Sequence, residues 1–173
     1  MNNFEVKIWD DERRFCTFYT VQLDGSEENE TDKFFLRFEK IPTYESDAQA
    51  LLSFILLSIG EEHGAIDELL NRNEEEVIGL PVKGRVRLGE FTYNYPDFPL
   101  RIYVLKITDE IVVLFNGGIK DGSTNRESSL HLNWVEACEF ARKIIDGIKN
   151  GAVVVDNVNR KLLNEKGTEE IIL

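Results

Sequence analysis

The stretch LRIYVLKITDEIVVLFNGGIKDGSTNR, residues 100–126, carries the clearest fold signal in the chain. Apolar and polar residues alternate over 100–107, which is the two-residue period of a strand. Residues 111–115 are all apolar, which is typical of a strand at the centre of a sheet. Because only Thr108, Asp109 and Glu110 separate the two runs, we predict two adjacent antiparallel strands joined by a tight turn.

The flanking sequence extends this pattern in both directions. Asn116-Gly117-Gly118 predicts a turn in which glycine supplies a positive φ angle. Residues 83–93 alternate and predict a third strand, which would complete an antiparallel meander. Residues 130–149 have apolar side chains at helical spacing, and short strands are expected at 153–155 and 171–173.

The first half of the chain predicts a hairpin followed by helices. Residues 4–8 and 15–23 have strand character, with a turn between them. Ser46-Asp47-Ala48-Gln49 has the form of a capping box and starts a helix that reaches about Glu62. That helix is apolar nearly all round, as expected for one buried between layers. Other helical segments are expected at 32–40, capped by Thr31, and at 65–71.

These elements predict a single α+β domain over residues 1–173, in which helices pack on an antiparallel sheet. The acidic loop 73–76 divides it into a hairpin-plus-helices extension, 1–76, and a sheet-and-helix core, 81–173. With 42% apolar and 30% charged residues, the composition excludes a wholly disordered, collagen-like or disulfide-scaffold chain.

The net charge of −12 comes entirely from the first half. Residues 1–80 carry 7 basic and 19 acidic side chains, whereas residues 81–173 carry 13 of each. A nucleic-acid binder usually has the opposite sign, because phosphate contacts need Lys and Arg. An acidic excess instead favours solubility and basic partners.

The sequence predicts a cytoplasmic protein with no membrane association. Cys16 and Cys138 lie far apart in apolar segments, which indicates two buried free thiols and a reducing compartment. The N-terminus lacks the regions of a secretory signal, and the longest apolar run, 48–59, is too short to span a bilayer. His63 and Asp67 share a helix face, but no spacing supplies a third ligand, so we expect neither a metal nor a cofactor.

Arg101 and Lys120 are the candidate functional pair. Arg101 lies on the first strand of the hairpin and Lys120 follows the second, so both side chains can approach one site. Two such cations suit phosphate recognition and the stabilisation of a charged transition state. Alternatively, Arg101 and Lys106 are solvent-facing charges of an amphipathic strand, and Lys120 is a loop charge.

The same stretch resembles the core of the RelE/ParE superfamily of bacterial toxins, especially its HigB-like branch. Members of that branch have an Arg-bearing strand, an acidic turn and an apolar strand that ends His-Gly-Phe-x-Lys-Lys. The corresponding residues are Arg101, Asp109-Glu110 and then Asn116 to Lys120, while Asp121 stands at the second lysine. The resemblance extends loosely over residues 83–149.

This resemblance implies a RelE-like core and metal-independent, ribosome-associated cleavage of mRNA, usually restrained by an antitoxin. In such a ribonuclease Arg101 and Lys120 would neutralise the phosphate, and Tyr103 would act as acid or base. Lys106 and Arg126 would bind RNA. The departures from the motif also allow a RelE-like fold without catalysis.

An acidic binding module is the alternative, for example an immunity or inhibitor protein that pairs with a basic partner. A basic concave patch around Arg101 and Lys120 would favour the enzyme. A continuous acidic surface from the 10–12 turn to the 27–32 loop would favour the binding module. The sequence predicts no oligomeric state.

Overall fold

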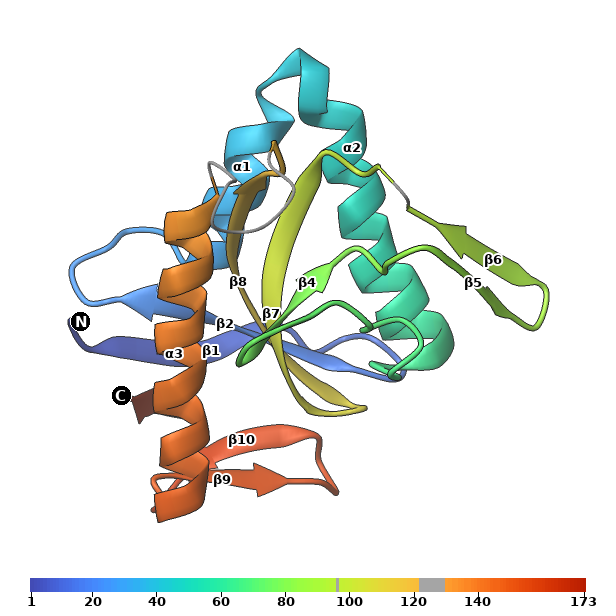
Figure 1. The fold of residues 1–173 in the computed structure, drawn as a ribbon. Coiled ribbons are helices and arrows are strands. Elements are labelled where there is room, and N and C mark those ends of the chain that lie inside the picture. Colours follow the sequence, from blue (N-terminus) through green and yellow to red (C-terminus); the bar gives the residue numbers. More distant parts are fainter. Residues whose placement is uncertain (96, 122–129) are drawn as a thin grey trace.

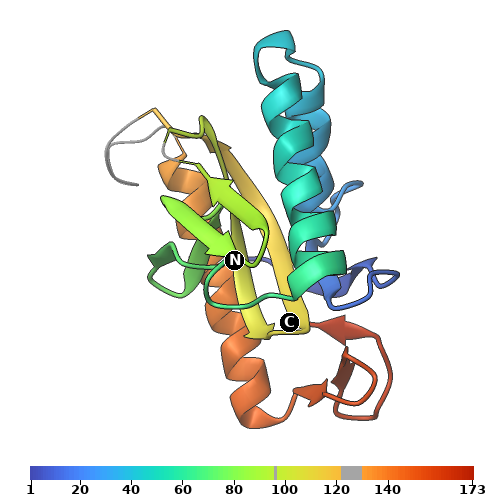
Figure 2. The same cartoon turned by 90° about the vertical axis from the view of Figure 1, so that its right-hand side faces the viewer.

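The computed structural model describes residues 1–95, 97–121 and 130–173, and places a seven-stranded sheet between two layers of helices (Figures 1 and 2). Neighbouring strands run antiparallel except β2 and β8, which are parallel. The mixed α+β class and the mostly antiparallel sheet are therefore confirmed. In spatial order the strands are β11 (Ile171–Ile172), β1 (Phe4–Asp10), β2 (Thr17–Leu23), β8 (Ile111–Ile119), β7 (Leu100–Thr108), β4 (Val77–Leu80) and β3 (Asn73–Glu74).

Strand β8 lies at the centre of the sheet, as its apolar run predicts. Each residue from Ile111 to Phe115 is completely buried, because helices cover both faces of the strand. The two parts of the chain, 1–76 and 81–173, meet in this sheet, since β2 pairs with β8. Both parts therefore contribute strands to the same sheet.

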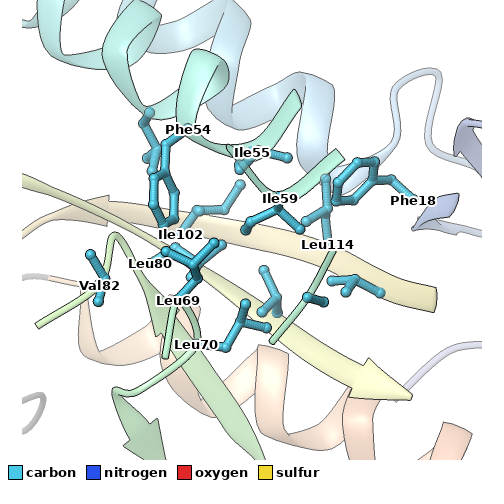
Figure 3. Packing of buried hydrophobic residues seen from close by; sticks show 14 of the residues in the cluster. Phe18, Phe54, Ile55, Ile59, Leu69, Leu70, Leu80, Val82, Ile102 and Leu114 are labelled. Atoms are coloured by element: carbon cyan, nitrogen blue, oxygen red, sulfur yellow. The ribbon is translucent and has the colours of Figure 1, made fainter. Parts of the chain in front are cut away.

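Three consecutive helices cover one face of the sheet: α1 (Glu30–Glu39), α2 (Pro42–Ser53) and η1 (Phe54–His63). Ile55 and Ile59 pack there against Ile102 and Leu114 of the sheet (Figure 3). Helix η1 is wound as a π-helix, and at its end the Gly64 amide donates to the Ile59 carbonyl five residues earlier. The expected helix buried between layers is therefore present as α2 and η1.

Helix α3 (His131–Asn150) covers the opposite face of the sheet. Its Phe140 and Ile144 are buried against the sheet, and Gly151 ends it in a left-handed conformation. The hairpin of β9 (Val153–Asp156) and β10 (Lys161–Asn164) follows. Among the described residues, no helix is long and apolar enough to cross a membrane.

Both cysteines are buried free thiols, as predicted. Burial raises the pKa of Cys16 to about 12 and that of Cys138 to about 11. Both therefore remain protonated and unreactive at neutral pH.

Three local helix predictions are wrong. Asn29, not Thr31, caps α1: its Oδ1 accepts from the Asp32 amide at 2.8 Å, while the Thr31 hydroxyl lies 2.7 Å from that of Thr20. Helix α2 begins at Pro42 rather than after Ser46, because proline lacks the amide hydrogen that the first helical turn leaves unpaired. Residues 65–71 form turns instead of a helix.

The prediction of one strand over 83–93 is also wrong. These residues lie in a separate two-stranded ribbon of β5 (Arg85–Leu88) and β6 (Phe91–Asn94), which turns at Gly89, where φ is +61°. The strand beside β7 is therefore β4 rather than 83–93, and β4, β7 and β8 are adjacent and antiparallel. The presumed loop 73–76 instead contains β3, which pairs with β4.

Asn116-Gly117-Gly118 does not form the predicted turn, because β8 continues through it to Ile119. Neither glycine has a positive φ. Gly117 is needed for a different reason: a Cβ at this position would overlap the Arg101 carbonyl of β7. The glycine permits close approach of the two central strands.

Candidate functional site

Arg101 is buried in the sheet instead of lining an open cleft. Its Nη1 lies 2.7 Å from Oε1 of Glu74 on β3, and the two side chains are 9% and 15% exposed. The side chain reaches Glu74 by passing over Gly79 of β4, where a Cβ would lie 2.8 Å from Arg101 Cδ. Glu74 therefore neutralises the guanidinium inside the folded chain.

Tyr103 lies on the same face of β7 and is completely buried. Burial raises its pKa strongly, and the Glu74 carboxylate raises it further. The phenol therefore stays protonated at neutral pH. Glu74 joins the two predicted residues into one buried cluster, which also receives a hydrogen bond from Trp134 Nε1 to the Glu74 carbonyl at 3.2 Å.

Lys106 lies near the other end of β7, away from Arg101. Its Nζ is 2.7 Å from a carboxylate oxygen of Asp67 and 2.7 Å from one of Asp109. Burial lowers its pKa, but these two carboxylates outweigh burial and raise the pKa overall. Lys106 is a positive charge held between two negative ones.

Two predicted residues remain, Lys120 and Arg126. Lys120 directly follows Ile119, and its amide donates to the Pro99 carbonyl at 2.7 Å. Arg126 lies outside the described residues. The structure thus brings Arg101 and Tyr103 together around Glu74 but places Lys106 elsewhere, and the catalytic and RNA-binding roles remain predictions.

Separate turns meet at one end of the sheet (Figure 1). A different set of charged residues lies on these turns. Backbone hydrogen bonds join these turns: Phe15 to Gly60, Ala65 to Asp109, and Thr17 to Glu110, at 2.6–2.8 Å. The turn between β1 and β2, the end of η1 and the turn between β7 and β8 are therefore fixed relative to one another. We call the carboxylates carried there the acidic end: Asp10, Asp11, Glu12, Glu61, Asp67, Glu68, Asp109, Glu110 and Glu169.

Arg14 and Arg160 also lie at this end of the sheet and form no ion pair among the described residues. Three other cations of the acidic end are each shared by two carboxylates. Lys106 has this arrangement, and so do two other side chains. Arg13 Nη2 lies 3.4 Å from Asp10 Oδ2, and Arg13 Nη1 lies 3.9 Å from Glu61 Oε1. Lys161 Nζ lies 3.0 Å from Asp11 Oδ2 and 3.3 Å from Glu169 Oε1. Each such group keeps a net negative charge.

Three further carboxylates of the acidic end, Glu12, Glu68 and Glu110, are exposed. None of them forms an ion pair with another residue of the described chain. They add unneutralised negative charge to the surface.

The sequence anticipated only part of this surface. The turn at Asp10 belongs to it, but Glu27 and Glu28 lie beyond the opposite end of the β1–β2 hairpin, where Phe4 pairs with Leu23. Asp109, Glu110 and Glu169 come from the electrically balanced half of the chain. Charge counting along the sequence could not assign them to the acidic end, because only folding brings those turns together.

His63 and Asp67 do not share a helix face, because η1 ends at His63 and Asp67 lies in a turn. Asp67 pairs with Lys106. The His63 ring lies edge-on to Phe91 at 5.6 Å between ring centroids and contacts Tyr93 as well. His63 therefore helps to hold the β5–β6 ribbon against η1.

No protein-family model, curated protein or solved structure matches this chain.

Proposed function

We propose that this chain is a binding protein whose acidic end recognises a basic partner protein. The observation that carries the proposal is the convergence of carboxylates from separate turns, with each of Arg13, Lys106 and Lys161 shared by two of them. Like charges at this density remain stable next to one another only because the intervening cations and the backbone hydrogen bonds hold them. A basic surface would relieve the remaining repulsion.

Two physical effects favour such recognition. Clustered negative charge steers a positively charged partner and raises the association rate, most strongly at low salt. Main-chain hydrogen bonds already hold the turns together, so the backbone needs little further ordering when a partner binds. The net charge of −12 acts in the same direction at longer range.

The alternative, a RelE-like ribonuclease, requires cations that can reach a phosphate. Arg101 is buried and paired with Glu74, and Lys106 is held by Asp67 and Asp109. Tyr103 is fully buried. These contacts support binding over catalysis as the role of the folded chain.

The test measures binding of a fluorescent nona-arginine peptide as a defined basic probe. The variant Glu12→Gln/Glu68→Gln/Glu110→Gln removes exposed charge from the acidic end, and Glu27→Gln/Glu28→Gln/Glu45→Gln removes the same charge elsewhere. We expect the first variant to weaken binding about tenfold, at a few tenths to 1 kcal/mol per charge, and the control to weaken it less than about threefold. Equal losses would show that only net charge matters and would overturn the proposal.

Expression of the chain alone separates the two functions. The binding role predicts normal growth and undisturbed translation in a bacterial host. The ribonuclease role predicts growth arrest that Arg101→Ala relieves while the protein remains folded, because loss of one preorganised cation typically costs about 10²–10³ in rate.

A further inference from the structure

The β5–β6 ribbon presents a cationic face that neither proposed function uses. Arg85 pairs with Asn94 and Arg87 with Thr92. Because directly opposed residues of an antiparallel pair share a face, these four side chains lie together. All four are exposed, and the ribbon extends away from the main sheet (Figure 1).

The other face of the ribbon anchors it to the body of the protein. Val86 and Leu88 pack on the hydrophobic core, and the Tyr93 ring lies 5.8 Å from that of Phe54. The Tyr93 hydroxyl lies 3.1 Å from a carboxylate oxygen of Glu62. The cationic face is therefore held outward by packing beneath it.

The ribbon cations are not neutralised within the described chain. Arg85, Arg87 and the preceding Lys83 form no ion pair there, in contrast to Arg101 and Lys106. The outward face of the two paired strands carries no carboxylate.

Side-chain hydrogen bonds to the backbone fix the base of the ribbon. Asn71 holds both the amide and the carbonyl of Lys83, at 2.6 and 3.1 Å. Arg72 donates to the Tyr95 carbonyl at 3.1 Å and fixes the other side of the base.

We propose that this face binds the phosphodiester backbone of single-stranded nucleic acid. Arg85 and Arg87 lie two residues apart on β5, which separates them by about 6.6 Å. This distance is close to that between successive phosphates along an extended single-stranded nucleic acid. Guanidinium groups bind phosphate oxygens in bidentate fashion, and Thr92 and Asn94 supply neutral donors beside them. The cations form one row on β5, and the adjacent row on β6 is neutral. The face therefore matches one nucleic-acid strand better than the two strands of a duplex.

The expected affinity is modest and strongly dependent on salt. Each neutralised phosphate of a single strand contributes about −0.7 to the slope of log K against log salt concentration, so Lys83, Arg85 and Arg87 together predict a slope near −2. The net charge of −12 opposes binding at longer range. Binding should therefore be clear at low salt and weak at physiological salt.

The experiment is a fluorescence-anisotropy titration of the full chain with a labelled oligo-uridine of about 20 nucleotides, between about 20 and 150 mM salt. Arg85→Ala/Arg87→Ala should reduce the steepness of the slope by about 1.4 and weaken binding at least tenfold at low salt. Lys149→Ala/Lys166→Ala removes the same charge from exposed sites elsewhere and should weaken binding less than about threefold. Thermal unfolding of each variant verifies that it is folded.

The proposal is overturned if the wild-type chain does not bind at low salt, or if both double variants lose affinity equally. Tighter binding of a duplex of the same length would also overturn the single-strand assignment. The acidic-end variant Glu12→Gln/Glu68→Gln/Glu110→Gln should bind the oligonucleotide at least as well as the wild type. Failure of the ribbon proposal is therefore distinguishable from failure of the acidic-end proposal.

Discussion

Arg101 Nη1 donates to Glu74 Oε1 at 2.7 Å, and the arginine side chain passes over Gly79 to reach it. This ion pair links β7 to β3 across the intervening β4. Both side chains are largely withdrawn from solvent. Arg101 therefore stabilises the edge of the sheet, whatever else the chain does.

Glu74→Gln should lower the free energy of unfolding by about 3–5 kcal/mol, because it leaves a buried guanidinium without its counter-charge. The double variant Arg101→Met/Glu74→Leu should recover most of this loss, since it removes both charges and keeps apolar volume. Urea unfolding of the three proteins measures both effects. A loss below about 1 kcal/mol for Glu74→Gln would show that solvent screens the pair.

Gly117→Ala should prevent stable folding or cost more than about 4 kcal/mol, because its Cβ would overlap the backbone carbonyl of Arg101, which cannot move without separating the central strands. Gly118→Ala is the matched control. Its Cβ would meet Leu130 Cβ at 3.1 Å and the Asn133 side chain at 3.2 Å, contacts that small adjustments relieve. Thermal unfolding compares the two. Equal stability would contradict the close approach of β7 and β8 at Gly117.

The sequence predicted the elements whose signal is local. Strands β7 and β8 and helix α3 follow from periodicity within each segment, and the burial of 111–115 follows from its unbroken apolar run. The alternation of apolar and polar residues over 83–93 was misleading, because two strands of a hairpin can produce the same alternation as one long strand. Only Gly89, at positive φ, marks the turn.

The candidate site was harder to predict because its partners are distant in the sequence. Glu74 is 27 residues from Arg101 and lies in a stretch whose acidic composition suggested a solvated loop. Lys106 is similarly neutralised by Asp67, 39 residues away. The sequence does not show whether a charged side chain on a strand faces solvent or pairs with a carboxylate of another element.

Ile55→Ala should reduce the free energy of unfolding by about 2–5 kcal/mol, since Ile55 is completely buried between η1 and the sheet. Leu57→Ala, two residues further along the same helix, is the control because Leu57 is 49% exposed. It should cost no more than about 0.5 kcal/mol. Urea unfolding distinguishes them. Similar losses would mean that η1 does not present the face to the core that Figure 3 shows.

Glu136→Gln should stabilise the protein at pH 7. Partial burial of Glu136 raises the pKa of its carboxyl in the folded state, and the nearby charges of Glu30 and Glu139 add to this, while Lys33 opposes it. The stability supplied by the neutral carboxyl is therefore fully present below the ordinary glutamate pKa of 4.5 and is lost as pH rises through the folded value. At pH 7 the carboxylate is charged and unfavourable, so its neutral isostere relieves the cost.

The measurement is the free energy of unfolding of the wild type and Glu136→Gln at pH 7 and near pH 4.5. We expect the variant to be more stable at pH 7, and the difference to shrink towards pH 4.5 because the wild-type carboxyl then becomes neutral in the folded state. Asp146→Asn, an exposed charge on the same helix, is the control and should show a much smaller gain at pH 7. A gain that persists unchanged at pH 4.5 would assign the effect to packing rather than to ionisation, and no gain at pH 7 would show that Lys33 already compensates the charge.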